Sequence, residues 1–398
     1  MITPAEAAAA IAAALQPADS QVTSLGACAG QALADDVSAE RDAPPFDRVA
    51  MDGVALASVD YVQGCRDFPI RGIQAAGAPA LALTDARSCL EAMTGAVLPR
   101  GCDAVVPVER ITVDGGLARL PDGLAVVPGL NVHVRGSDVR AGARVLATGT
   151  IIGPAEVAIL ASAGLAELRT SRPLRIAVVS TGDELIDPGQ PIADHQVRRS
   201  NPWAIAAALQ LAGFGRPTDR HLRDDLAALQ AGIGELLAVN DVLILSGGVS
   251  AGRFDHVPAA LGNLGVNRVF HKVAQRPGKP LWFGTGPAGQ AVFALPGNPV
   301  SVLACLARYV LPALALLSGG TARSRTLRLA SAYRVKAPLA LLLPVTVEYD
   351  SDGCPWAWPH PTQGSGDFHA LAGSAGIIEL PPGPAVVEHG TRVILYPW

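Results

Sequence analysis

The stretch 240–252, NDVLILSGGVSAG, decides the fold class, because it reads as a buried strand that runs directly into a glycine-rich loop. The same order recurs at 173–185 (PLRIAVVSTGDEL), at 271–285 and at 289–299. A helical segment, 201–214, with Asn201 as its expected N-cap, lies among these units. Strands that alternate with helices predict an open α/β/α domain with a mostly parallel sheet. In such sheets, the loops at the carboxyl ends of the strands meet at one edge and carry the binding groups.

The sequence on either side of this region predicts β structure. From about residue 54 to 130, short apolar runs alternate with glycine and proline turns, which indicates a small β domain. Residues 319–398 again show short strands with turn signals and predict a second β domain, a barrel or a sandwich. The first residues predict a helix capped at Thr3, with Pro4 in its first position. The fold class is therefore multidomain, α/β plus β.

The composition argues against several classes of protein. The 398 residues carry a net charge of −4, with 17% charged residues, so no broad basic surface indicates binding to nucleic acid. The six cysteines form no CxxC pair, which argues against structural zinc and a disulfide framework and favours a reducing cytoplasm. The first residues also lack the basic region of a signal peptide. We therefore expect a cytoplasmic protein.

The segment from Val300 to Leu317 is almost unbroken apolar sequence and about as long as a bilayer is thick, so it predicts either a membrane span or a buried helix. Arg308 in its middle would need a partner inside lipid, which favours the buried helix and a protein without a membrane span. Asn298 is a suitable N-cap for this helix. The free N–H groups of its first turn would then face the binding edge of the sheet, as an anion site.

Three further groups of residues predict a phosphorylated or oxyanionic ligand at this edge. The loop SGGVSAG (246–252) offers backbone N–H groups to a phosphate, although it is not a P-loop, because no Gly-Lys-Ser/Thr follows. Lysine occurs at only three positions in the chain, and two of them flank Arg276 in HKVAQRPGKP. Acids on adjacent loops suit a bridging Mg²⁺. Each group also has a purely structural interpretation: the glycine loop can be a tight turn, and the acids and cations can be solvated surface residues. The acids are Asp183, Glu184, Asp224, Asp225 and Asp255, and the cations are Lys272, Arg276 and Lys279.

The order of motifs along almost the whole chain resembles the molybdopterin molybdenumtransferase family, which is related to the C-terminal domain of gephyrin. The motifs include PPFDRVAMDG (44–53), STGDELIDPGQPI (180–192), SGGVSAGRFD (246–255), LPGNPVS (295–301) and TQGSGDFHAL (362–371). The resemblance implies a transferase that takes adenylylated molybdopterin and molybdate as substrates, with Mg²⁺. Molybdenum would be inserted into the dithiolene and AMP released, which gives molybdenum cofactor.

The resemblance also implies the domain organisation. A linker domain would consist of residues 1–42 and 131–171, with a β domain, 43–130, inserted between them. An α/β molybdopterin-binding domain would span 172–318 and a C-terminal β domain 319–398. The family forms homodimers, with each active site between the α/β domain of one subunit and the β domain of the other. Molybdopterin adenylyltransferase and molybdoenzyme-maturation proteins are the implied partners.

The resemblance assigns roles to individual residues in two sets. The implied catalytic carboxylates are Asp52, Glu184, Asp224 and Asp255, of which Glu184 and Asp255 would bind Mg²⁺. The implied substrate-binding residues are Thr94, Asp138, Gly247, Gly248, Ser250, Lys272, Arg276, Lys279, Pro299 and Ser365.

The chain departs from the family pattern at three places. The usual Asn-Ser before AMDG is Arg48-Val49, the usual YDTN is RRSN at 198–201, and a usual lysine is Arg276. The first two changes favour, as an alternative, a non-catalytic carrier of the finished cofactor or a specialised paralogue, whereas Arg276 can still bind an oxyanion. The adenylyltransferase is a second alternative, but it needs neither the AMDG domain nor the C-terminal barrel. Arg48 is expected to point away from the cleft, to add a cation to it, or to block it.

Overall fold

The computed structural model describes residues 1–249, 256–321 and 324–398, and the chain forms two compact units. The larger unit comprises Met1–Ala34, Gly149–Gly153 and Glu167–Trp398, and the smaller unit comprises Asp35–Thr148 and Pro154–Ala166. The predicted Ser250 and Asp255 lie outside the described residues.

The larger unit is built on a six-stranded sheet with the strand order β16-β13-β17-β21-β20-β18. The first four strands are parallel, which confirms the predicted mostly parallel core. β20 runs antiparallel to both of its neighbours, because only residues 286–290 join it to β21, and a parallel connection needs a longer crossover. The bounds are β16 (Thr218–Leu222), β13 (Ile176–Thr181), β17 (Val242–Ser246), β21 (Ala291–Leu295), β20 (Trp282–Thr285) and β18 (Asn267–His271).

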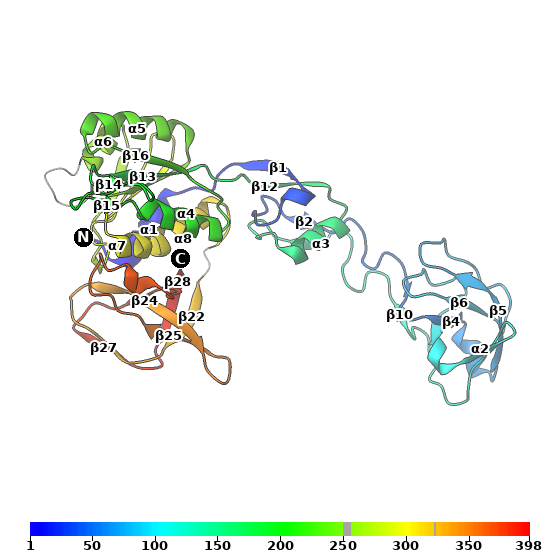
Figure 1. The fold of residues 1–398 in the computed structure, drawn as a ribbon. Helices are drawn as coiled ribbons and strands as arrows, with labels where there is room; N and C mark the ends of the chain where they lie inside the picture. The colour runs from blue at the N-terminus through cyan, green and yellow to red at the C-terminus, as the bar shows by residue number, and fades with distance from the viewer. Residues whose placement is uncertain (250–255, 322–323) are drawn as a thin grey trace. The chain divides into compact units, whose positions relative to one another are not determined.

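Helices cover both faces of this sheet (Figure 1). Alternate residues of each strand point to opposite faces, so Ile176 and Val178 pack in one layer and Ala177 and Val179 in the other. The first layer contains α1 (Pro4–Ala14), α4 (Asn201–Leu211), α7 (Pro299–Cys305) and α8 (Leu311–Leu317), and the second contains α5 (Leu226–Val239) and α6 (Val257–Asn263).

The N-terminal helix α1 belongs to the first of these layers. Thr3 caps the helix and Glu6 completes a capping box, as the sequence predicted for the cap. Ala7 and Ile11 are buried in the same core as the sheet. This helix therefore packs on the α/β domain, whereas residues 1–42 were expected to be linker. The exact borders of the domains remain a prediction.

The apolar segment Pro299–Leu317 is a continuous helical run, and 67% of its most apolar window is buried inside the structure. The run consists of α7, a π-helical turn (Leu306–Val310) and α8. The π turn has a local cause, because Pro312 has no N–H group and cannot continue the regular hydrogen-bond pattern of the helix. In the turn before it, the N–H of Leu311 donates to the carbonyl of Leu306, five residues earlier. Among the described residues, this is the one helix whose length and composition would suit a membrane span. Its burial favours the core-helix interpretation.

The C-terminal domain is a closed barrel, as its first and last paired strands also pair with each other. The strands follow in the order β24-β25-β22-β28-β26, and β26 returns to β24. β19 (Gln275–Arg276) adds to β24 in parallel and so joins the α/β domain to the barrel. The bounds are β24 (Ala340–Tyr349), β25 (Pro355–Pro359), β22 (Arg325–Leu329), β28 (Arg392–Pro397) and β26 (Gly376–Leu380), with a hairpin of β23 (Tyr333–Val335) and β27 (Ala385–Val387).

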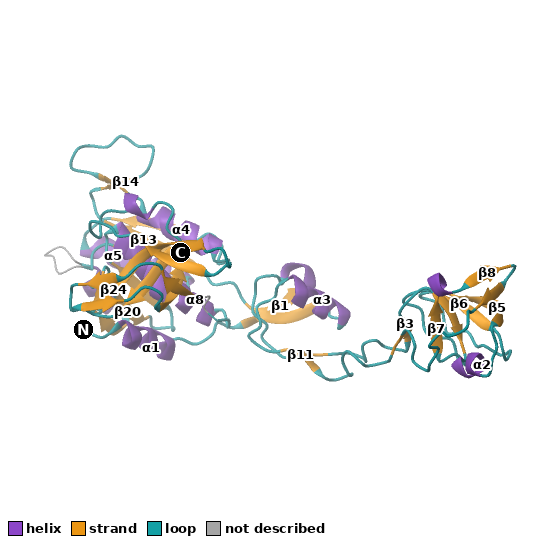
Figure 2. Cartoon of the chain, turned by 90° about the horizontal axis from the view of Figure 1, so that it is seen from below, coloured by secondary structure: helices purple, strands orange, loops and turns teal. Residues whose placement is uncertain are grey.

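The smaller unit is mainly a six-stranded sheet with the order β7-β4-β6-β5-β9-β8, which confirms the predicted β domain (Figure 2). Phe68 and Leu56 are fully buried in its core. The strands of the sheet are β4 (Gly53–Leu56), β5 (Asp67–Gln74), β6 (Cys89–Ala92), β7 (Ala104–Pro107), β8 (Thr112–Asp114) and β9 (Leu117–Arg119). The helices of this unit are α2 (Ser58–Val62) and α3 (Pro154–Ser162). Two short strand pairs complete the unit: β2 (Val37–Ser38) with β11 (Arg144–Leu146), and β3 (Arg48–Val49) with β10 (Val132–His133).

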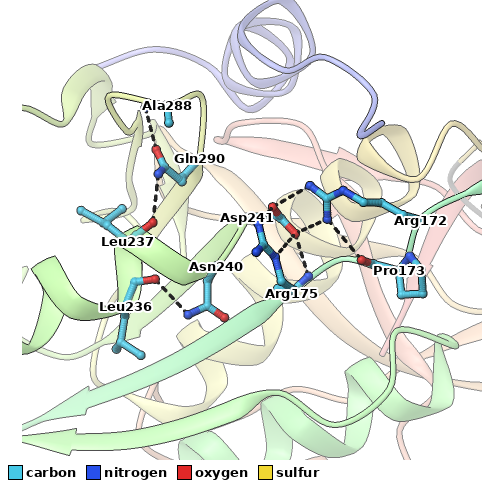
Figure 3. Close-up of polar contacts among 9 residues, drawn as sticks. All are labelled: Arg172, Pro173, Arg175, Leu236, Leu237, Asn240, Asp241, Ala288 and Gln290. Carbon is cyan, nitrogen blue, oxygen red and sulfur yellow. Dashed lines mark hydrogen bonds and ion pairs between the residues drawn. The ribbon is translucent and has the colours of Figure 1, made fainter. Parts of the chain in front are cut away.

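An arginine–aspartate cluster ties together the amino ends of β13 and β17 (Figure 3). Asp241 accepts two hydrogen bonds from the guanidinium of Arg172, at 2.7 and 2.8 Å, and further ones from the backbone and side chain of Arg175. Burial acts to raise the pKa of Asp241, but these hydrogen bonds outweigh it and hold the pKa well below its ordinary value. The cluster lies at the edge of the sheet opposite the carboxyl ends of the strands.

We expect Asp241→Asn to lower the free energy of unfolding by about 2–4 kcal/mol at pH 7, because two arginines lose their shared anion. A carboxyl whose native pKa is depressed stabilises the fold above its unfolded pKa of about 3.9, and this contribution is lost as the pH falls. The difference between wild type and variant should therefore narrow below about pH 4. Urea unfolding at several pH values measures both effects. The exposed Asp194→Asn is the control, and an equal loss in both variants would contradict the role of the cluster.

Candidate functional site

A cavity of about 1450 Å³ lies in the larger unit, between the α/β sheet and the C-terminal barrel. The loops that follow β13, β17, β19 and β21 all line it. These are the four loops that the sequence predicted to meet at one edge of the sheet. The C-terminal barrel of the same chain contributes the opposite wall. The resemblance implied a β domain of the other subunit beside the site, and that arrangement remains a prediction.

Two of the predicted carboxylates, Glu184 and Asp224, line the cavity together. Burial raises the pKa of Asp224, and the nearby charges of Glu184 and Asp183 act in the same direction. The Thr181 hydroxyl donates a hydrogen bond to Asp224 at 3.3 Å and partly opposes this rise. Asp224 can therefore hold a proton at higher pH than an ordinary aspartate, as a group that exchanges protons with a substrate or water should.

The predicted glycines, Gly247 and Gly248, also line the cavity, and both have left-handed φ values, of 100° and 66°. A Cβ on Gly247 would lie 2.8 Å from the Thr181 carbonyl oxygen, and a Cβ on Gly248 would lie 2.7 Å from a methyl carbon of Val257. The two glycines thus allow the backbone to turn directly after β17. They also leave this wall of the cavity without side chains.

The start of helix α7 faces the cavity, and a barrel loop covers it. Asn298 is the N-cap and Pro299 the first residue, as predicted. The Asn298 amide donates to the Ser365 hydroxyl at 2.6 Å rather than capping the helix, and the Val300 N–H donates to the Ser365 carbonyl at 3.1 Å. The predicted Pro299 and Ser365 are therefore brought together, and one helix N–H group is already satisfied by protein.

Asn201 was predicted as the cap of helix α4, and this is wrong. The N-cap is Ser200, and Asn201 is the first helical residue. Its amide instead donates to the Ser246 hydroxyl at 2.8 Å and to the Gly297 carbonyl at 2.7 Å. Asn201 therefore fixes two loops of the cavity to each other, which local helix-capping rules could not show.

Four cations line the cavity with neither an ion pair nor a side-chain hydrogen bond in the described part of the chain: Arg276, Lys279, Arg334 and Lys336. The first two were predicted, and the last two come from the barrel and were missed. Lys336 had a visible signal, since it is the third of only three lysines. Lys272 is not among the residues that line the cavity. An excess of cations over two carboxylates makes the cavity a site for anions.

The unusual pair Arg198-Arg199 also borders the cavity, but its guanidinium groups are engaged by protein. Arg199 is buried and donates to Asp187 at 2.7 Å, to Asp219 at 2.7 and 2.8 Å, and to the Ser180 hydroxyl at 2.9 Å. Arg198 donates to two carbonyls of the same loop. Both arginines therefore hold the loop that follows Glu184.

The remaining predicted residues, Asp52, Thr94 and Asp138, lie in the smaller unit. The backbone N–H of Thr94 donates to Asp52 at 2.6 Å, and this bond lowers the pKa of Asp52 below its ordinary value. Asp138 receives a hydrogen bond from a histidine that contacts Arg48. Arg48 thus joins a polar chain, while Val49 is fully buried in the core.

These features define a class of protein: an α/β domain that binds a phosphorylated or oxyanionic ligand beside two carboxylates, closed by a β barrel. Family models identify the three parts. The MoeA N-terminal region (domain I and II) matches residues 2–164, a probable molybdopterin binding domain matches 177–316, and the MoeA C-terminal region (domain IV) matches 326–398.

Similar proteins cover nearly the whole chain. A molybdopterin molybdenumtransferase from Synechocystis sp. is 39% identical over 370 residues, which is 93% of each chain, and one from Haemophilus influenzae is 34% identical over 309 residues, covering 76% of this chain and 74% of that protein. A crystal structure of a molybdopterin biosynthesis MoeA protein from Pyrococcus horikoshii matches with a TM-score of 0.82 at 27% identity, over 100% of this chain and 99% of that one. The chain belongs to the molybdopterin molybdenumtransferase family.

Proposed function

We propose that this chain is a transferase that inserts molybdenum from molybdate into adenylylated molybdopterin, with Mg²⁺-dependent release of AMP. The cavity is the observation that carries the proposal, because four cations without side-chain partners line it together with two carboxylates. The cations suit the phosphates of the adenylate and the molybdate oxyanion. The family supports the same reaction class, since relatives that are 39% and 34% identical are named for it.

The described residues fit a Mg²⁺ ion that arrives together with phosphate. Mg²⁺ is usually held by one or two carboxylates, several waters and substrate phosphates, rather than by a complete protein cage. Glu184 supplies such a carboxylate, and the described residues hold no cluster of three or more His, Cys, Asp or Glu side chains placed for a metal. When bound, the ion would neutralise phosphate charge. The proposed role of Asp255 rests on the family resemblance.

The carboxylates also suit the chemistry of adenylate cleavage. Water adds to the adenylate phosphorus, the bond to the pterin phosphate breaks, and AMP leaves. The water loses a proton in this step, and Asp224 can accept that proton. Burial raises the pKa of Asp224, so its carboxylate binds a proton more readily than an ordinary aspartate does. Arg276 and Lys279 hold the phosphate or molybdate oxygens during the transfer.

The proposal extends to the setting of the enzyme. The chain acts in the cytoplasm as a homodimer, and it receives its substrate from molybdopterin adenylyltransferase and passes the cofactor to molybdoenzyme-maturation proteins. Asp52, Thr94, Asp138 and Lys272 are further substrate-binding positions. Arg48 and Arg199 each have a protein partner, which supports tolerated substitutions at these two places rather than a non-catalytic carrier.

The reaction is tested with purified protein, adenylylated molybdopterin, molybdate and Mg²⁺. We expect release of AMP together with formation of molybdenum cofactor, and both should stop when Mg²⁺ is chelated. A protein that binds finished cofactor but releases no AMP would be a carrier, and that result would overturn the proposal. A parallel assay with tungstate measures the choice of oxyanion.

We expect Arg276→Ala and Lys279→Ala each to weaken molybdate or adenylylated molybdopterin binding by about 10-fold, since a hydrogen bond to a charged ligand contributes about 1.5–3 kcal/mol. The difference should shrink at high salt, because screening weakens exposed charges. Calorimetric titration measures the affinities. Arg392→Ala, on the exposed side of the barrel, is the control. Unchanged affinity in both cavity variants would make the loop 271–280 a solvated turn.

A further inference from the structure

The smaller unit contains a polar chain of three side chains: Arg48, His133 and Asp138. A guanidinium nitrogen of Arg48, Nη2, lies 3.0 Å from Nδ1 of His133, and Nε2 of His133 lies 2.8 Å from Oδ1 of Asp138. The geometry is supported by the backbone, because Arg48 on β3 is paired directly opposite His133 on β10. Directly opposed residues of antiparallel strands have neighbouring side chains.

Both ends of this polar chain, Arg48 and Asp138, are anchored to the smaller unit. Val49, the neighbour of Arg48, is fully buried, so β3 is fixed to the core. The backbone N–H of Asp138 donates to the Ala43 carbonyl at 3.0 Å. The histidine between them is therefore held from two sides. Its side chain is 36% exposed and that of Asp138 is 55% exposed, so a ligand can reach the aspartate.

The contacts determine which nitrogen of His133 carries the proton. A guanidinium has only N–H donors, so Nδ1 of His133 must accept from Arg48. In the neutral imidazole, the proton then resides on Nε2. This Nε2–H donates to the Asp138 carboxylate, which accepts. All three groups have compatible roles in one tautomer only.

We propose that His133 is a positioning residue for Asp138, and that Arg48 selects the tautomer of His133 that performs this task. The proposal rests on the proposed function, in which Asp138 is a substrate-binding position. Oδ1 of Asp138 is occupied by His133 and, more weakly, by the Ser137 hydroxyl at 3.4 Å. The other carboxylate oxygen has no hydrogen-bond partner in the described part of the chain and is free for an N–H or O–H group of the substrate.

The tautomer is tested directly by nitrogen NMR of protein labelled with ¹⁵N-histidine. The His133 resonances are identified by their loss in His133→Gln. We expect wild type to show a protonated Nε2 and a bare Nδ1. Arg48→Met should shift the Nδ1 resonance, because Nδ1 loses its donor, and Asp138→Asn should shift the Nε2 resonance. A proton on Nδ1 in wild type, or an Nδ1 resonance that Arg48→Met does not move, would overturn the assignment of Arg48.

Activity tests the positioning role through two matched substitutions. His133→Gln keeps an N–H donor that can reach Asp138, whereas His133→Phe keeps the size but has no donor. We expect kcat/KM for AMP release to fall about 10- to 100-fold in His133→Phe and to stay within about 3-fold of wild type in His133→Gln, because a small displacement of a substrate contact has effects of this size. His389→Phe, which can retain the stack on Trp356 in the barrel, is the control.

The outcomes separate this proposal from the proposed function. Equal activity of His133→Phe and wild type would overturn the positioning role and leave the function standing. A melting temperature of His133→Phe that falls in parallel with its activity would show a merely structural role. If wild type releases no AMP, the proposed function fails. The contact between His133 and Asp138 is tested separately by NMR, and an Nε2 resonance that Asp138→Asn does not move would overturn it.

Discussion

Glu184→Gln should lower Mg²⁺-dependent AMP release by about 10²- to 10⁴-fold, the range expected when a general base or a metal-binding carboxylate is lost. The substitution keeps the size of the side chain and removes its charge. Glu184 is exposed at the cavity, so the folded state should be little affected. Single-turnover measurements at saturating substrate report the loss in kcat, and melting temperatures check the fold.

Glu235→Gln provides a matched control, because it makes the same chemical change on an exposed turn of helix α5, away from the cavity. Asp224→Asn should show a loss similar to that of Glu184→Gln. Since the pKa of Asp224 is raised, the acid limb of kcat/KM should lie above the ordinary value of about 3.9 in wild type and disappear in Asp224→Asn. Near-normal turnover by a folded Glu184→Gln protein would show that this carboxylate neither binds the metal nor assists the reaction.

The strand-to-loop units could be predicted from the sequence, because they depend on local pattern. Runs of β-branched residues ended by glycine loops at 173–185 and 240–252 correctly indicated parallel neighbours. The antiparallel β20 was not expected, since its direction follows from the length of the connection to β21 rather than from its own residues. The barrel, as opposed to a sandwich, was likewise open until the pairing of β24 with β26 was seen.

The candidate site shows the same division. Residues on the loops of one sheet, such as Glu184 and Arg276, could be placed together from sequence because loops at the carboxyl ends of parallel strands converge. Arg334 and Lys336 could not, because they enter the cavity only when the barrel packs on the sheet. Asn201 shows a further limit: its residue type suits a helix cap, but tertiary hydrogen bonds to two loops determine its role.

The helix Pro299–Leu317 meets the barrel through a buried ion pair. Nε of Arg308 donates to the Glu379 carboxylate at 2.7 Å, and the Arg308 side chain is only 11% exposed. Its guanidinium lies over the ring of Tyr396, 4.6 Å from the centroid. Around this pair, the helix residues Ala304 and Ala307 pack against barrel residues in a small apolar cluster. The charge that argued against a membrane span therefore has its partner in the barrel.

Glu379→Leu alone should lower the free energy of unfolding by about 3–5 kcal/mol, because it leaves the Arg308 charge buried without a partner. Arg308→Met alone should have a smaller effect, since the Glu379 side chain is 26% exposed and can be hydrated. The double variant Arg308→Met/Glu379→Leu should recover most of the loss, as apolar replacements of buried ion pairs are often neutral or stabilising. Urea unfolding of all four proteins gives the coupling energy of the pair.

Arg325→Met serves as the control, because it removes an exposed arginine at the start of the barrel. If Glu379→Leu changes the free energy of unfolding by less than about 0.5 kcal/mol, the pair behaves as a surface salt bridge. The contact between helix and barrel would then rest on its apolar cluster alone. A large coupling would instead show that one arginine, in a helix apolar enough to cross a membrane, fixes that helix against the barrel and so helps to hold the two walls of the cavity together.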